Sequence, residues 1–259
     1  MILYKYTDLN TAIEHFGENG TIKFSKPLSF NDPFETSALF YKEKMPDTYQ
    51  ININSINDHY GILCLTKSPN NVLMWSHYAT GEKLPNHDIT PINLSGDSHG
   101  GIVFGIDAEE AGLNSKQNYL IPATHGEIEY KHTMPSEKFI ESENALIFNG
   151  EVQEFNGSLY HALKRVFLIK STLWQYEEEV RVVKNFNGIN ENYNHGIEEL
   201  NRKSVKEIYI GCGHSYSSAR CLADYFASKF TAAKVYWMEL VPNKWKLNPI
   251  LLRQAHEQN

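Results

Sequence analysis

The sequence predicts an α+β fold. Segments with the alternation or the apolar runs of strands are mixed with segments that carry apolar residues at helical spacing. They do not follow the strand–helix–strand rhythm of a doubly wound parallel sheet. The 259 residues, 41% of them hydrophobic, suffice for one well-formed core. We therefore expect a single domain over residues 1–259 with a loop insertion near residues 80–99, where Gly, Pro, Asn, Asp and His accumulate.

The chain is expected to open with a strand at residues 2–6, a helix capped by Asp8, and a second strand at residues 21–25. A polar, turn-rich loop follows at residues 26–35. The further expected elements are a buried strand at 60–66, a short helix at 71–79, strands at 101–107 and 126–130, a helix at 157–169, strands at 177–184 and 205–211, a helix at 215–230 and a last strand at 235–240.

Composition limits the classes of function. The formal net charge of −7 argues against a protein that coats nucleic acid, because non-specific affinity comes from phosphate neutralisation. Cys64, Cys212 and Cys221 have no paired spacing, which indicates a reducing compartment without disulfides or structural zinc. The histidines lack HxxxH or HExxH spacing, so no metal site is expected. Without a signal-peptide pattern or an apolar run of about 20 residues, we expect a cytoplasmic protein that does not enter a membrane.

An acidic segment at residues 174–181, WQYEEEVR, is the first candidate for chemistry. If residues 177–184 form a strand, Glu177, Glu179 and Arg181 share one face, beside the aromatic Trp174. Such a row can hold an ionised carboxylate against a cationic or hydroxyl-bearing ligand, with Arg181 helping to keep Glu179 charged. The alternative is a solvent-facing strand edge that carries charges without a chemical role.

The loop FSKPLSFNDPFE, residues 24–35, is the second candidate. Asn31 and Asp32 can bond their own backbone and Pro33 fixes φ, so a turn is expected there. An aromatic-rich loop with exposed polar groups can bind a nucleotide by enclosing it. It can equally be an ordered loop held by Phe30 and Phe34.

The segment MWSHYA places Trp75, His77 and Tyr78 within about one helical turn. A histidine can serve as an acid, a base or a hydrogen-bond partner near neutral pH. The alternative assigns Trp75 and Tyr78 to the core and makes His77 a structural residue.

Taken in order, these segments resemble an uncharacterised bacterial family of domains of unknown function. The shared motifs are LYKY at residues 3–6, FxxPxxFNDPFE at 24–35, MWSHYA at 74–79, a glycine-led strand at 101–107, WxYExExR at 174–181 and a strand ending in Gly at 208–211. The resemblance spans nearly the whole chain. Thr7 stands where the family often has Arg, and the insertion at 80–99 departs from its short step from helix to strand.

The order of elements is also similar, in plan, to the ADP-ribosyltransferase superfamily. This resemblance implies two small mixed sheets around a cleft with flanking helices, and NAD bound as a substrate. It makes Glu179 the catalytic carboxylate and Glu177 the acceptor-side general base. The implied NAD-binding residues are Lys5, Tyr6, Ser25, Trp75, His77, Tyr78 and Arg181, with Trp75 or Tyr78 stacking on a ring, and the implied substrate contacts are Asn31, Asp32 and Trp174.

We therefore expect an ADP-ribosyltransferase-like enzyme that modifies a nucleic acid or a protein, in the setting of a toxin or a phage-defence effector. A metal-dependent nuclease is the first alternative, with Asp32, Glu35, Glu177 and Glu179 as ligands and Lys170 or Lys184 as helper. A non-enzymatic binding module, which recognises a ligand or partner through the loop at residues 80–99, is the second.

Overall fold

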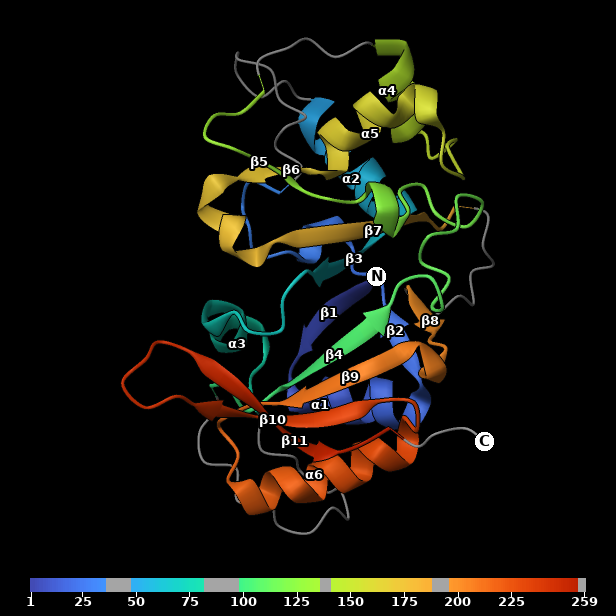
Figure 1. Cartoon of the computed structure of the whole chain (residues 1–259). Coiled ribbons are helices and arrows are strands. Elements are labelled where there is room, and N and C mark those ends of the chain that lie inside the picture. Colours follow the sequence, from blue (N-terminus) through green and yellow to red (C-terminus); the bar gives the residue numbers. More distant parts are fainter. Residues whose placement is uncertain (36–47, 82–97, 136–140, 188–195, 256–259) are drawn as a thin grey trace. The chain divides into compact units, whose positions relative to one another are not determined.

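The computed structural model describes residues 1–35, 48–81, 98–135, 141–187 and 196–255, which form a mixture of helices and β-strands (Figure 1). The chain divides into two compact units. Unit 1 comprises Met1–Ile22, Leu65–Ala111 and Glu199–Asn259, and unit 2 comprises Lys23–Cys64 and Gly112–Glu198. The predicted α+β class is confirmed. The single domain with an insertion near residues 80–99 stays a prediction, because residues 82–97 lie outside the described part of the chain.

Unit 1 is built on a mixed sheet. Strand β1 (Ile2–Thr7) pairs antiparallel with β4 (Ile102–Asp107), which pairs antiparallel with β9 (Val205–Ile210). Strand β10 (Lys234–Leu240) runs parallel to β9 and pairs antiparallel with β11 (Leu247–Arg253), which ends the sheet. The step between the parallel strands β9 and β10 requires a crossover, and helix α6 supplies it.

Capping residues mark the starts of the helices of unit 1, and a glycine ends the first of them. The Asp8 carboxylate accepts the Thr11 N–H and opens α1 (Leu9–Thr11), which continues as the π-helical segment η1 (Ala12–Asn19) and ends at Gly20 with a φ of 64°. Asn71 caps α3 (Val72–Tyr78), and Ser215 caps α6 (Tyr216–Lys229). Helix α6 packs against β9, β10 and β11.

Unit 2 combines short strands with three helices. Strand β7 (Glu179–Asn185) is hydrogen-bonded to β3 (Tyr60–Thr66), whose last two residues belong to unit 1. Strands β5 (Glu129–Lys131) and β6 (Ile169–Ser171) pair in parallel. The helices are α2 (Thr48–His59), α4 (Glu141–Phe148) and α5 (Tyr160–Phe167). Among the residues that the structure describes, the short helical turns of the two units are η2 (Pro27–Ser29), η4 (Ala123–His125), η5 (Gly157–Leu159), η6 (Thr172–Glu177) and η7 (Arg202–Ser204). Strands β2 (Thr21–Lys23) and β8 (Ile197–Glu199) lie at the unit boundaries.

The core of unit 2 is an apolar cluster beneath these elements. Its fully buried members include Tyr60, Leu163, Phe167 and Val183. The Tyr60 hydroxyl donates to the Ile147 carbonyl at 2.8 Å, so its one polar group is satisfied inside the core. The strong amphipathicity of the YHALKRVF sequence explains why α5 turns Leu163 and Phe167 inward.

Several predicted bounds were wrong. The helix expected at 157–169 is a helical turn followed by α5, which ends at Phe167 before β6 begins. The strand expected at 177–184 begins only at Glu179. The strand expected to be the last is followed by β11, which contains Pro249; a proline is tolerated there because β11 lies at the edge of the sheet. None of the described helices is both long enough and apolar enough to cross a membrane.

One close approach of two backbones in unit 2 requires a glycine. The Arg181 N–H donates to the Gly126 carbonyl at 2.8 Å, and a Cβ at position 126 would lie only 1.8 Å from the Arg181 carbonyl oxygen. No side chain fits in that space, so Gly126 fixes how the segment before β5 pairs with β7.

We predict that Gly126→Ala lowers the free energy of unfolding by about 3 kcal/mol or more, because the backbones must separate. Gly157→Ala is the matched control, since a Cβ there meets no atom within 4 Å. Its expected effect is within about 0.5 kcal/mol. Urea denaturation of both variants measures the difference, and equal stability of the two would contradict this packing.

Candidate functional site

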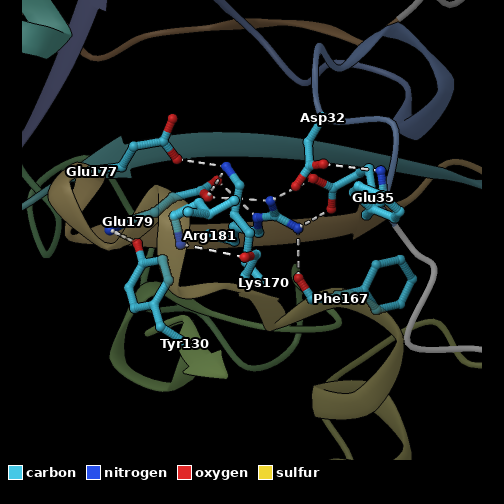
Figure 2. A network of polar contacts seen from close by, with 11 residues as sticks. Asp32, Glu35, Tyr130, Phe167, Lys170, Glu177, Glu179 and Arg181 are labelled. Carbon is cyan, nitrogen blue, oxygen red and sulfur yellow. Dashed lines mark hydrogen bonds and ion pairs between the residues drawn. The ribbon is translucent and has the colours of Figure 1, made fainter. Parts of the chain in front are cut away.

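The guanidinium of Arg181 lies at the centre of a polar network in unit 2 (Figure 2). Arg181 extends from β7 and its side chain is only 1% exposed. Its Nε donates to Glu179 Oε1 at 2.8 Å, and its Nη1 donates to Glu35 Oε1 at 2.5 Å and to the Phe167 carbonyl at 2.7 Å. Its Nη2 donates to Glu35 Oε2 at 3.0 Å and to Glu179 Oε2 at 3.2 Å. These five hydrogen bonds match the five donors of a guanidinium.

Lys170 joins the two carboxylates of the acidic segment. It lies on β6, and its Nζ donates to Glu177 Oε2 at 2.5 Å and to Glu179 Oε2 at 3.2 Å. All three side chains are at most 7% exposed. The Lys170 ammonium also lies 4.8 Å from the centre of the Trp174 ring, a favourable cation–π distance. Two carboxylates and one aromatic face therefore surround a single ammonium.

Glu177 and Glu179 do not meet by strand alternation, and this part of the sequence prediction was wrong. Glu177 is the last residue of η6, and β7 begins at Glu179. Between them, Glu178 is left-handed with a φ of 45°, which only a few non-glycine residues adopt. This turn brings both flanking side chains onto Lys170, while Glu178 itself is exposed.

Glu179 is held as an anion. Burial raises the pKa of its carboxyl, but the charges of Arg181 and Lys170, with hydrogen bonds from Arg181 and Cys64, outweigh burial and lower the pKa from 4.5 to about 2. Burial by itself lowers the pKa of Lys170, yet the charges of Glu179 and Glu177 raise the pKa above its ordinary value. Glu179 and Lys170 are thus both charged at neutral pH.

The loop before residue 36 supplies the third carboxylate. The buried Asp32 accepts the Phe34 N–H at 2.9 Å through its side chain, and its carbonyl accepts the Glu35 N–H at 3.0 Å. This turn directs Glu35 onto Arg181, whose guanidinium also lies 5.5 Å from the centre of the Phe30 ring. The predicted turn at Asn31 and Asp32 is therefore present, and it positions a carboxylate.

A cavity of about 170 Å³ in unit 2 reaches the network at Lys170. Phe34 and Ile169 supply apolar walls, and His132 and Ser171 supply polar ones. Of the members of the network, Lys170 is the residue that also lines this cavity. The volume of this cavity is below the roughly 300–1,000 Å³ of a site for a drug-sized ligand, so the cavity has room for about one ring.

The remaining predicted residues fall in two groups. Ser25, in unit 2, pairs with Ile62 through its backbone, and its role in binding stays a prediction. In unit 1, the buried Tyr6 hydroxyl donates to the Ser68 carbonyl, and Trp75 is fully buried with its ring 5.5 Å from that of Tyr6. That burial fits the core alternative for Trp75. The other predicted residues of unit 1 are Lys5, His77 and Tyr78; their side chains are half-buried or exposed, and their role also stays a prediction.

Two members of the network entered the sequence analysis only through the nuclease alternative, namely Lys170 and Glu35. The sequence analysis did not identify two further members, Cys64 and Tyr130. The Cys64 thiol forms a hydrogen bond with the Glu179 carboxylate, and the Tyr130 hydroxyl accepts the Glu179 N–H at 2.9 Å. They come from distant strands, so no spacing in the sequence marks them. Among the described residues, no group of three or more His, Cys, Asp or Glu is arranged to hold a metal ion.

We predict that Arg181→Lys lowers the free energy of unfolding by about 3–5 kcal/mol, because lysine has three donors for five acceptor contacts and leaves buried carboxylate oxygens unpaired. The control is Lys131→Met, which breaks a pair with Glu129 whose side chains are 33% and 41% exposed. Its expected cost is at most about 1 kcal/mol. Chemical denaturation compares them, and a small effect of Arg181→Lys would show that the network is solvated.

The charge on Glu179 predicts how stability depends on acid. Its pKa is depressed in the folded chain, so its contribution is complete above pH 4.5 and is lost as the pH falls toward 2. We expect the carbon-13 shift of its carboxyl to report an ionised group down to the pH at which the chain unfolds. A titration midpoint near 4.5 in the folded protein would contradict the pairing with Arg181 and Lys170.

Comparison with known proteins gives a family without an assigned activity. No curated protein and no solved structure matches the chain significantly. Residues 74–182 match the family described as "Protein of unknown function (DUF2971)". This match supports the resemblance to an uncharacterised family of domains of unknown function, and it contains Lys170, Glu177, Glu179 and Arg181.

Proposed function

We propose that unit 2 carries an ADP-ribosyltransferase-like site that cleaves the nicotinamide–ribose bond of NAD. The observation that carries this proposal is the meeting of Glu177 and Glu179 on Lys170, at the wall of a cavity. Breaking that bond sends its electron pair to nicotinamide and leaves positive charge on the ribose. A fixed carboxylate next to the ribose stabilises that charge as it develops.

The charges of the network suit a cationic substrate group. Through the hydrogen bonds of the network, Glu35, Glu177 and Glu179 meet two cations, Lys170 and Arg181, so this set of described residues has one carboxylate more than it has cations. The nicotinamide of NAD is a pyridinium, and it would balance that charge. Because the pKa of Glu179 is about 2, the carboxylate needs no activation at physiological pH.

Lys170 gives the substrate a way to reach Glu179. The acceptor positions of Glu179 are filled by Arg181, Lys170 and the Cys64 thiol, so a ribose hydroxyl must replace one donor. The 3.2 Å contact from Lys170 is the replaceable one, because a lysine stem is flexible and Glu177 holds the same ammonium at 2.5 Å. The cavity beside Lys170 accommodates one ring of NAD, and Phe34 offers that ring an aromatic face.

The transfer step balances in atoms and charge. The acceptor attacks the anomeric carbon of the ribose, nicotinamide departs with the bonding pair, and the acceptor proton passes to a base. Glu177 is the proposed base, because its carboxylate lies beside Glu179 on the same ammonium. The acceptor is a nucleic acid or a protein, as expected for a toxin or a phage-defence effector, and water would give simple NAD hydrolysis.

We predict that the protein releases nicotinamide from NAD and that Glu179→Gln lowers the rate by at least about 100-fold, the weight of one preorganised charge in a transition state. Chromatography detects the nicotinamide, in reactions with and without DNA or a cell extract. Lys229→Met, which breaks an exposed pair with Glu18 in unit 1, serves as the control and should retain the rate.

A second readout separates loss of chemistry from loss of fold. Thermal unfolding with and without NAD reports binding, and Glu179→Gln should keep a shift in Tm if the variant folds. No nicotinamide release with any acceptor, together with no NAD-dependent shift in the wild-type protein, would reject the proposal. The nuclease alternative predicts magnesium-dependent cleavage, and the described residues offer it no arranged ligand set.

A further inference from the structure

A basic hairpin in unit 1 stands apart from an otherwise acidic chain. It comprises β10, β11 and the loop between them, residues 234–253; the two strands belong to the sheet, and the loop end extends beyond it in orange-red to red in Figure 1. It contains four basic residues and one acidic residue, whereas the whole chain has a net charge of −7. Positive charge is therefore concentrated on this hairpin.

The loop of the hairpin is ordered by its own turn. The Lys244 N–H donates to the Val241 carbonyl at 3.2 Å, and the Val241 N–H donates to the Lys246 carbonyl at 3.0 Å. Pro242 in the second position and Asn243 in the third, with a φ of 61°, form the pattern of a type II turn. The chain therefore presents the residues after the turn in a fixed direction.

Trp245 follows this turn and is completely exposed, at 104% of its reference area. Lys244 and Lys246 flank it, and both are exposed. A tryptophan is normally among the more buried residues of a protein, so full exposure at an ordered turn needs a reason. An exposed indole with a lysine on each side of it in the sequence offers a stacking face together with charges for two phosphates.

We propose that this hairpin binds single-stranded nucleic acid, with a base stacked on Trp245 and phosphates paired with Lys244 and Lys246. The charge is complementary to the nucleic-acid backbone, and every base has a π-face that an exposed indole can use. The loop favours this partner over a lipid surface, because the neighbours of Trp245 in the sequence are two lysines, preceded by Pro242 and Asn243. Insertion into lipid needs a larger contiguous apolar surface.

This binding surface is independent of the proposed NAD chemistry. It lies in unit 1, while the carboxylate network lies in unit 2, so either proposal can fail without the other. If both hold, the hairpin would identify a single strand as the class of acceptor or regulator.

The test measures fluorescence anisotropy of a short labelled oligo-thymidine over a series of salt concentrations. We expect saturable binding at low salt. Trp245→Ala should weaken it roughly 5- to 150-fold, the weight of one base stacked on an aromatic ring. Trp245→Phe should retain most of the affinity. Changing both Lys244 and Lys246 to Gln should lower the slope of log affinity against log salt by about 1.4, the value for two phosphate contacts with a single strand.

The control removes the same amount of charge elsewhere. Lys23 and Lys203, both exposed and outside the hairpin, are changed to Gln together, and the slope should remain that of the wild-type protein. The proposal is overturned if the wild-type protein does not bind the oligonucleotide, or if Trp245→Ala binds it as the wild type does. Binding to phosphatidylserine vesicles through Trp245, without binding to the oligonucleotide, would assign the hairpin to membranes instead.

Discussion

The buried guanidinium of Arg181 is the group on which the arrangement of unit 2 depends. A guanidinium cannot lose its proton inside a protein, so each of its five donors must find an acceptor once it leaves water. Three separate parts of the unit supply them: the turn that carries Glu35, the carbonyl of Phe167 at the end of α5, and Glu179 at the start of β7. Gly126 helps to place Arg181, because the absence of a side chain at Gly126 lets the two backbones lie against each other.

Such a network can contribute to stability and to chemistry, and different residues in it are suited to the two roles. Arg181 and Glu35 form a bidentate pair that leaves the guanidinium no other geometry, which suits a structural role. Lys170 differs, since its stem is flexible and it lies both in the network and at the cavity wall. Under the proposed function, Arg181 would hold Glu179 in place, and a shift of the Lys170 side chain would give a substrate access to that carboxylate.

Local signals in the sequence were sufficient for most of the fold. The apolar run of β3 gave its bounds, and the cap at Asp8 marked the start of a helix. The helices expected at 71–79 and 215–230 begin at Asn71 and Ser215, which the structure shows to be their caps. Helices α2 and α4 were missed because their apolar residues form no clear stripe, and β11 because of its proline. At the site, sequence spacing named Glu177, Glu179 and Arg181, but for a wrong geometric reason: the left-handed Glu178 replaces strand alternation. The contacts of Lys170, Glu35 and Cys64 depend on tertiary folding, which no local pattern encodes.

The extent of the family match bears on the two proposals differently. Residues 74–182 contain both carboxylates of the acidic segment and both cations of the network, whereas the basic hairpin at residues 234–253 lies outside the match. Four charged members of the network thus lie within the matched residues, whereas Glu35, Cys64 and the exposed Trp245 lie outside them. The two proposals therefore concern separate parts of the chain, the buried network of unit 2 and the hairpin of unit 1. Charge segregation supports that division, because the excess of carboxylates lies in the buried network and the excess of cations lies on the exposed hairpin.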